Sequence, residues 1–362
     1  MRRLLIHTVG VLTAVWGAGL VLTLLLAHLL PPSPQISFAF VAGGGRTGIQ
    51  LFDLGHRVPV LIADTTSPVQ SNIIQPPAYT WSPDGQQIVY EDRSFGTPRL
   101  MRRRIPDAAE LLADEEGGCS HPAWSVRDQI AYLCGWTLYL VDAQNAHQQA
   151  VADPSLESIA LQQMPFYSEL LWSADAQQLA HLSIAAQVRL SIISNEGVVR
   201  VDQRIEPPAT INRLFDWSAD RILTYSTNQN WKPHFREASG THISEPLPLV
   251  DHLVEYENGE VVLDFAWSPN DRLAAMIRSG RPWSLMITDG QLQERVKRFN
   301  FTTQIAMELV WSADSRSVYV IRLISGNQYE IARIDVETGM LEPVTPVFDL
   351  AMANLQWRPD DG

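Results

Sequence analysis

A tetrapeptide of the form Trp-Ser-x-Asp, or a close variant of it, recurs seven times along this chain of 362 residues. The intervals between successive copies are 43, 48, 45, 50, 44 and 46 residues. Repeats of this length are typical of folds in which one small unit of secondary structure is copied around a ring or along a stack. The copies begin at Trp81, Trp124, Trp172, Trp217, Trp267, Trp311 and Trp357.

Each unit of the repeat has room for four short strands. In the second unit the predicted strands cover residues 79–81, 87–91, 99–104 and 110–114. β-branched and aromatic residues alternate with polar ones in such runs, and Gly, Asn, Asp or Pro separates them. Units of four antiparallel strands are typical of the blades of a β-propeller.

The two ends of the repeat region are incomplete in complementary ways. Residues 36–65 supply three strands without a preceding Trp, whereas residues 353–357 supply a first strand and no more. Pairing these segments would complete one blade and leave no open sheet edge in the ring. Six complete units and this composite predict an all-β, seven-bladed β-propeller of four-stranded blades.

The N-terminal segment predicts a membrane anchor. Leu4 to Leu30 are 27 residues without Asp, Glu, Lys or Arg, which exceeds the roughly 20 needed to cross a bilayer. Arg2 and Arg3 favour a cytoplasmic N-terminus. We therefore expect a cytoplasmic tip and transmembrane signal-anchor helix over 1–30, a Pro-rich linker over 31–35 and the propeller over 36–362. A cleaved signal peptide is the alternative.

These features predict a single-pass membrane protein whose propeller lies outside the cytoplasm, at the cell surface or on the periplasmic side. The formal net charge is −13, from 27 basic and 40 acidic residues. This excess of negative charge disfavours electrostatic binding to the phosphate backbone, so a nucleic-acid partner is not expected.

The repeat motif resembles that of the TolB-like, WD40-like β-propeller family, whose units read roughly P-x-W-S-P-D-G before an apolar strand. Residues 81–85 match this pattern fully, and the copies at Trp267 and those with Ala at the third position match in part. The resemblance covers about 36–362. It implies a propeller in which Trp fills the space between blades and Ser and Asp hold a turn, so the seven motifs are expected to be structural.

The resemblance carries no activity with it. TolB-like translocation proteins have an α/β domain before the propeller, whereas a predicted membrane anchor stands there in this chain. Dipeptidyl-peptidase relatives append a hydrolase domain, for which no residues follow the last repeat. We therefore do not expect either activity.

Cys119 and Cys134, the two cysteines, flank the turn at Trp124 symmetrically. A hairpin centred between Val126 and Arg127 would place them directly opposite each other, and outside the cytoplasm they would form a disulfide. The alternative is a pair of buried thiols, because a shift of register by one residue would separate the sulfur atoms.

No catalytic or metal-binding motif stands out in the sequence. There is no G-x-S-x-G, H-E-x-x-H or C-x-x-C pattern, and the nine His residues are scattered. The glycines of residues 43–48 lack the Lys of a phosphate loop and predict a hairpin. We therefore expect no catalytic residues, no bound metal, no cofactor and no enzymatic activity.

Large aromatic and basic residues gather in the predicted connections between second and third strands, which share one face of a propeller. Exposed aromatic and Arg side chains are typical of binding hot spots. These residues predict a binding surface that faces away from the membrane, with packing between blades as the alternative. They are Arg46, Phe95, Trp136, Trp231, His234, Phe235, Arg281 and Trp283.

The sequence therefore predicts a non-enzymatic, membrane-anchored binding or scaffold module for a protein, peptide or glycan. Two alternatives are an accessory subunit of a membrane complex and a hydrolase or lyase with a site at the propeller channel. A cluster of His or carboxylate side chains at the channel mouth would favour the enzyme.

Overall fold

The structure is a computed structural model, and it describes residues 33–66, 75–144, 148–151, 167–184, 188–204, 211–218, 222–227, 233–239, 242–244, 262–278, 283–301 and 305–359. Gln35–Gly362 forms one compact unit. The predicted membrane segment over residues 4–30 lies outside the described residues. Within the described ranges, no helix is long and apolar enough to span a bilayer.

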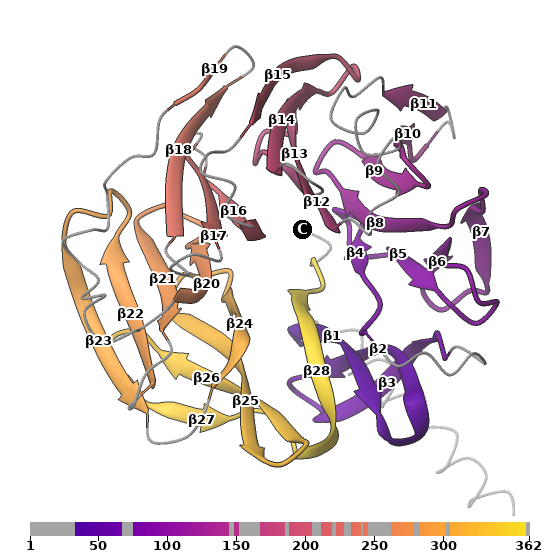
Figure 1. Ribbon diagram of the computed structural model, residues 1–362. Helices are drawn as coiled ribbons and strands as arrows, with labels where there is room; N and C mark the ends of the chain where they lie inside the picture. The colour runs from indigo at the N-terminus through magenta and orange to yellow at the C-terminus, as the bar shows by residue number, and fades with distance from the viewer. Residues whose placement is uncertain are drawn as a thin grey trace, which may run out of the picture. The chain divides into compact units, whose positions relative to one another are not determined.

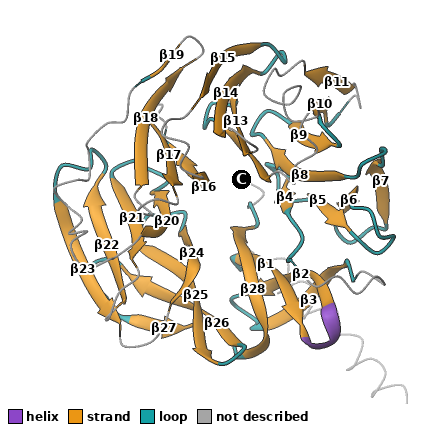
Figure 2. Ribbon diagram, in the orientation of Figure 1, coloured by secondary structure: helices purple, strands orange, loops and turns teal. Residues whose placement is uncertain are grey.

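The described part of the chain is almost entirely β-structure, with 28 strands (Figure 2). Five sheets have four strands each, and one sheet has eight. The first four-stranded sheet contains β4 (Tyr79–Trp81), β5 (Gln87–Asp92), β6 (Arg99–Arg104) and β7 (Ala109–Ala113), and the second contains β8 (Cys119–Trp124), β9 (Gln129–Cys134), β10 (Thr137–Asp142) and β11 (Gln148–Val151). The third contains β12 (Tyr167–Trp172), β13 (Gln178–Ile184), β14 (Val188–Ser194) and β15 (Val199–Arg204). The fourth contains β16 (Ile211–Trp217), β17 (Ile222–Thr227), β18 (Pro233–Ser239) and β19 (His242–Ile243).

The remaining sheets hold both ends of the described chain. The fifth four-stranded sheet is β20 (Val262–Trp267), β21 (Leu273–Arg278), β22 (Trp283–Asp289), β23 (Arg295–Phe301). The eight-stranded sheet contains β24 (Ile305–Trp311), β25 (Ser317–Ser325), β26 (Gln328–Asp335), β27 (Leu341–Pro343), β28 (Phe348–Trp357), β1 (Gln35–Ala42), β2 (Arg46–Asp53), β3 (Val58–Asp64). The glycines at Gly43–Gly45 form a short 3-10 turn between β1 and β2, drawn as the helical segment in Figure 2.

The sheets stand side by side around a centre, with one edge strand of each four-stranded sheet, and β24 and β28 of the eight-stranded sheet, innermost (Figure 1). Each inner strand contacts the next in the order β4, β8, β12, β16, β20, β24, β28. Strand β28 also contacts β4, where Gln356 Nε2 donates a hydrogen bond to the Tyr79 carbonyl at 2.9 Å. This contact closes the ring of inner strands. This arrangement is the propeller architecture that the sequence predicts.

Second strands differ from the predicted alternation of apolar and polar residues. In β9, for example, Ile130 to Cys134 are all buried. A second strand has a sheet neighbour on both faces, so apolar residues are needed on each side. The outer strands lack such cover, and in β3 the side chains of Val58 and Val60 are more than half exposed.

The repeated Trp residues connect neighbouring sheets. Trp172 packs among the apolar side chains of the preceding sheet, and its indole Nε1 donates to the Ala123 carbonyl at 3.1 Å. Trp311 makes the same bond to the Ala266 carbonyl at 3.0 Å. At Trp172 and Trp311 the indole therefore packs between sheets and its Nε1 has a hydrogen-bond partner there, as expected of a structural residue.

The Ser and Asp residues of the motif build the turn that follows. Ser312 Oγ donates to Asp314 Oδ1 at 2.6 Å, and the backbone N–H groups of Arg316 and Ser317 donate to these two side chains. The hydrogen bond from Ser312 lowers the pKa of the Asp314 carboxyl. The same Ser-to-acceptor bond recurs at Ser82, Ser173 and Ser268.

The last repeat departs from the motif by placing Arg358 where the others have Ser. Arg358 Nε donates to the Gly85 carbonyl in the first turn at 2.7 Å, and Nη1 donates to Gln35 Oε1 at 2.7 Å. Alongside this contact, β28 pairs with β1 from Ile36↔Trp357 to Ala42↔Leu350. The predicted pairing of the N-terminal and C-terminal segments is thus present in the structure.

Carboxylates on inner strands bind the backbone of the next inner strand. Asp216 Oδ2 accepts from Trp267 N at 2.8 Å, and Asp264 Oδ2 accepts from Leu309 N at 2.7 Å. Glu308 Oε2 accepts from Leu355 N at 2.7 Å. Burial raises the pKa of the Asp216 carboxyl to about 6, although two backbone hydrogen bonds oppose this shift. These bonds hold the inner strands in register around the centre.

The structure contains a disulfide between Cys119 and Cys134, which pair directly across β8 and β9. The alternative of two unpaired thiols does not apply.

We predict that Cys119→Ala/Cys134→Ala lowers the free energy of unfolding by roughly 3 kcal/mol, because a cross-link over 15 residues restricts the unfolded chain. Chemical denaturation of both proteins measures the difference. A reducing agent should bring the wild type to the stability of the variant and leave the variant unchanged.

The Asp216 carboxyl has a pKa of about 6 in the folded protein, against an ordinary value of 3.8. The folded state then binds the proton more tightly than the unfolded state, so this carboxyl favours folding more as pH falls through 6 toward 4. The Asp216→Asn variant lacks this pH-dependent contribution to the free energy of unfolding, because an amide does not titrate in this range. The stability difference between variant and wild type should change by on the order of 2–3 kcal/mol between pH of about 4 and about 7. A constant difference across that range, measured by chemical denaturation, would contradict the assignment.

Candidate functional site

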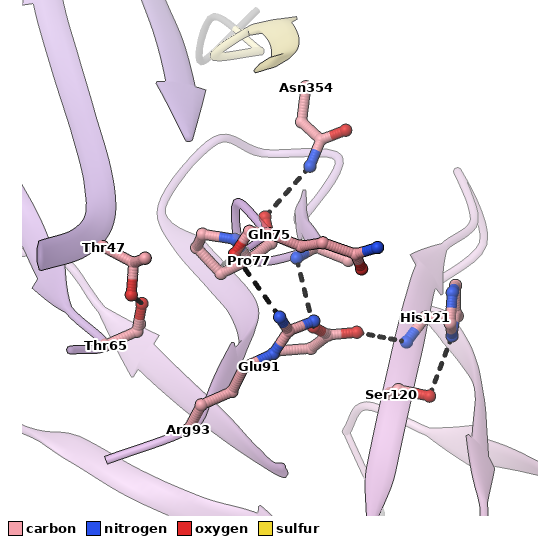
Figure 3. A network of polar contacts seen from close by, with 10 residues as sticks. Thr47, Thr65, Gln75, Pro77, Glu91, Arg93, Ser120, His121 and Asn354 are labelled. Atoms are coloured by element: carbon pink, nitrogen blue, oxygen red, sulfur yellow. Dashed lines mark hydrogen bonds and ion pairs between the residues drawn. The ribbon is translucent and has the colours of Figure 1, made fainter. Parts of the chain in front are cut away.

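A network of polar side chains lies where β5 ends and β8 begins (Figure 3). The Trp-Ser-x-Asp turns join first strands to second strands, so in antiparallel sheets this network lies at the opposite face. The strand β8 that carries part of it is one of the inner strands (Figure 1). The network therefore combines an inner position with the face where the variable connections lie.

Glu91 is the centre of the network. Its side chain is 1% exposed, and its Oε2 accepts a hydrogen bond from Arg93 Nη2 at 2.6 Å. Its Oε1 accepts from the backbone N–H of His121 at 3.0 Å. A buried carboxylate requires such partners, since an unpaired charge in the interior is strongly unfavourable. Glu91 thus joins two neighbouring sheets through one carboxylate.

His121 occupies an irregular position in β8. Its backbone has φ of 55°, and the pairing of β8 with β9 shifts register between Ser120 and Ala123. A bulge of this kind redirects a side chain out of the regular alternation of the strand. The His121 Nδ1 atom lies 2.8 Å from Ser120 Oγ.

The surroundings of His121 keep its imidazole neutral near pH 7. Burial lowers the pKa of His121 below 6.5, and the charges of Arg93 and His181 act in the same direction. The carboxylate of Glu91 acts against them. His181 itself is fully buried in β13. A neutral imidazole can accept a proton, and Arg93 is near enough to influence the pKa of this one.

The segment before β4 closes one side of the network. Arg93 Nη1 donates to the Gln75 carbonyl at 3.4 Å, and Asn354 Nδ2 donates to the Pro77 carbonyl at 3.0 Å (Figure 3). The Tyr79 hydroxyl donates to the Asn354 carbonyl at 2.6 Å. The site therefore depends on β28 as well as on β5 and β8. Among the residues that the structure describes, no group of three or more His, Cys, Asp or Glu side chains is placed to hold a metal ion.

The structure places the predicted binding residues on five different sheets. Arg46 begins β2 and is exposed, Phe95 lies in the β5–β6 connection, and Trp136 lies in the β9–β10 turn. Trp283 begins β22 and packs against the apolar cluster between the sheets of β20–β23 and β24–β27, which fits the alternative of packing between blades. His234 and Phe235 fall within β18 and not in a connection. Trp231 and Arg281 lie outside the described residues.

Sequence reasoning did not single out Glu91, Arg93 or His121. A signal was present, because Glu91 ends the predicted strand 87–91 directly after the apolar run 88–90, and Asp92 follows it. Acidic residues that continue an apolar strand are candidates for paired, buried charges. Their partner on β8 is distant in sequence and could not be deduced from the pattern alone.

No family model and no curated protein matches the sequence. Similar solved structures establish the fold. A 6-phosphogluconolactonase-like protein from Bacteroides fragilis has a TM-score of 0.60 and 12% identity, covering 90% of this chain and 98% of its own. An oligogalacturonate lyase from Vibrio parahaemolyticus has a TM-score of 0.54 and 11% identity, covering 86% of each chain.

A third similar structure is a puromycin-hydrolyzing peptidase from Mycobacterium tuberculosis, with a TM-score of 0.58 and 14% identity. The match covers 86% of this chain and 53% of the peptidase, so the chain spans about half the length of that protein. Together these structures show that the described part of the chain has the β-propeller fold.

The comparison corrects the functional prediction. The sequence predicts a non-enzymatic binding or scaffold module and no enzymatic activity, whereas the similar structures are a lactonase-like protein, a lyase and a peptidase. That prediction is wrong. It rested in part on the absence of short catalytic motifs, and a site whose groups come from separate strands need not contain such a motif.

We predict that Glu91→Gln lowers the free energy of unfolding by about 1–3 kcal/mol, because a neutral amide leaves the Arg93 charge without its partner. Glu110→Gln is the matched control. Glu110 also pairs with an Arg, Arg102, but its side chain is 61% exposed. Loss of that pair should cost less than about 1 kcal/mol. Equal losses in the two variants, measured by chemical denaturation, would show that Glu91 is not held as described.

Proposed function

We propose that this protein is a hydrolase or lyase whose general base is His121, with Arg93 binding an anionic group of the substrate. The observation that carries the proposal is the single carboxylate of Glu91, which bonds both the Arg93 guanidinium and the His121 backbone. This link holds the Arg93 guanidinium and the backbone of His121 against one carboxylate at the junction of two sheets. Enzymes of both classes need a positioned base next to a group that binds negative charge.

The imidazole would accept one proton in either reaction. If Nδ1–H donates to Ser120 Oγ, Nε2 is the basic nitrogen. In a lyase, Nε2 would remove a proton from the carbon next to a carboxylate while the carbon–oxygen bond at the adjacent carbon breaks. In a hydrolase, it would remove a proton from water that attacks an acyl carbon. In both cases the imidazolium would return the proton to the departing oxygen.

The substrate class we propose is a sugar acid derivative. Arg93 supports this choice, since a guanidinium recognises a carboxylate through paired hydrogen bonds. The two similar structures matched over most of both chains are named for a gluconolactone and for oligogalacturonate, both of which are sugar acid derivatives. The net charge of −13 repels an anionic substrate, so binding such a substrate requires a local cation.

We also propose a wider setting for this activity. The repeat motif supports a TolB-like, seven-bladed ring, with the eight-stranded sheet comprising two blades joined where β26 meets β28 at Tyr329↔Phe348. The uncharged stretch over residues 4–30 supports a membrane anchor, and the linker over 31–35 would hold the propeller near the outer surface. The disulfide supports the location outside the cytoplasm.

The enzymatic proposal is tested with the full chain and two substrate sets, oligogalacturonates and sugar acid lactones. Ultraviolet absorbance of an unsaturated uronate reports elimination, and acid release reports hydrolysis. We expect turnover in one set, and a loss of roughly 100-fold or more in kcat in His121→Gln. Activity should rise with pH through a value below 6.5, because the base must be neutral.

His56→Gln is the matched control, because His56 is an exposed residue in the β2–β3 turn. It should retain wild-type activity. Absence of turnover in both substrate sets, or an equal loss in both His variants, would refute the proposal. Thermal unfolding of each variant separates loss of a base from loss of the fold.

A further inference from the structure

Phe95 is held at the surface beside the proposed site. Its side chain is 68% exposed, the largest exposure among the large hydrophobic side chains that the structure describes. The Arg99 guanidinium lies over the ring at 3.5 Å from its centroid. Arg99 is in turn fixed by Asp92, whose Oδ2 accepts from Arg99 Nη2 at 3.2 Å. The buried Asp92 carboxylate thus holds the Arg99 guanidinium, and Arg99 in turn holds the Phe95 ring.

The connection that carries Phe95 is fixed at both ends. At its start, Ser94 N donates to Asp92 Oδ1 at 2.9 Å, and Gly96 N donates to the Arg93 carbonyl at 3.1 Å. Gly96 has φ of 95°, which a residue with a side chain rarely adopts. At its end, the Pro98 carbonyl accepts from Cys119 N at 2.7 Å. The ring is therefore presented by an ordered turn.

The turn also ties Phe95 to both proposed functional groups. Arg93, which pairs with Glu91, precedes Phe95 by two residues, a span of at most about 7 Å between Cα atoms. The contact of Pro98 with Cys119 lies two residues before His121. Phe95 therefore lies in the connection that begins at Arg93 and that contacts the start of the strand carrying His121.

We infer that Phe95 and Arg99 form a second subsite that stacks a neighbouring sugar ring, so that the substrate is an oligosaccharide. This inference rests on the proposed function. The C–H groups of a sugar ring carry partial positive charge and pack against the negative face of an aromatic ring. Exposed aromatic side chains that are already ordered lose little conformational entropy on binding. Arg99 holds the ring in place while Asp92 balances its charge.

The inference is tested by binding in a His121→Gln background, where turnover is slowed. The full chain is titrated by calorimetry with galacturonate and with trigalacturonate. Phe95→Ala should weaken trigalacturonate binding by roughly tenfold and change galacturonate binding by less than about twofold. Phe95→Trp should restore the affinity for trigalacturonate. Val126→Ala is the control, since Val126 is 64% exposed in a repeat turn at the opposite face.

The outcomes distinguish the two proposals. If Phe95→Ala binds trigalacturonate as tightly as its parent, the subsite is refuted and the proposed function stands. If Phe95→Ala weakens both ligands equally, Phe95 supports the main site and the oligosaccharide subsite is likewise refuted. If the parent binds neither ligand and the wild type turns over neither substrate set, the proposed function and the subsite fail together.

Discussion

Contact between neighbouring sheets is the interaction on which the rest of this structure depends. A four-stranded sheet cannot bury both of its faces alone, so each sheet relies on the next for its core. The indole of Trp311 shows how the sequence meets this need, because it fills the space between two sheets and bonds the Ala266 carbonyl. Carboxylates such as Asp264 add a second connection between inner strands. Packing and hydrogen bonding thus act together at this junction.

The proposed site uses the same kind of junction for a different purpose. Glu91 crosses from β5 to β8 much as Asp264 crosses from β20 to β24, but its second oxygen holds Arg93 instead of serving the backbone alone. The side chain of His121 leaves the regular strand pattern at the same point. In the proposed site, a structural connection between sheets would therefore also hold Arg93 and the backbone of the proposed base.

The sequence allowed the architecture to be predicted more fully than the site. Regular spacing predicted the repeat, and symmetry about a hairpin centred between Val126 and Arg127 predicted the Cys119–Cys134 pairing, because both depend on local register. The role of Arg358 could not be predicted, since its contact with Gly85 crosses 273 residues. His121 and Glu91 were missed for the same reason. Their chemistry arises from a bulge and from a contact between sheets, neither of which has a fixed sequence pattern.

The pairing of β28 with β1 bears on how the chain matures. Ser37 bonds the Gln356 carbonyl across 319 residues, so the pairing of β1 with β28 cannot form until nearly the whole described chain has been synthesised. Until then β1 has an unpaired edge, and the segment before β4 lacks its contact with Asn354. Because that segment closes one side of the network around Arg93, the proposed site is complete only once β28 has been synthesised. A nascent or truncated chain would carry the Glu91 and His121 side chains without a finished site.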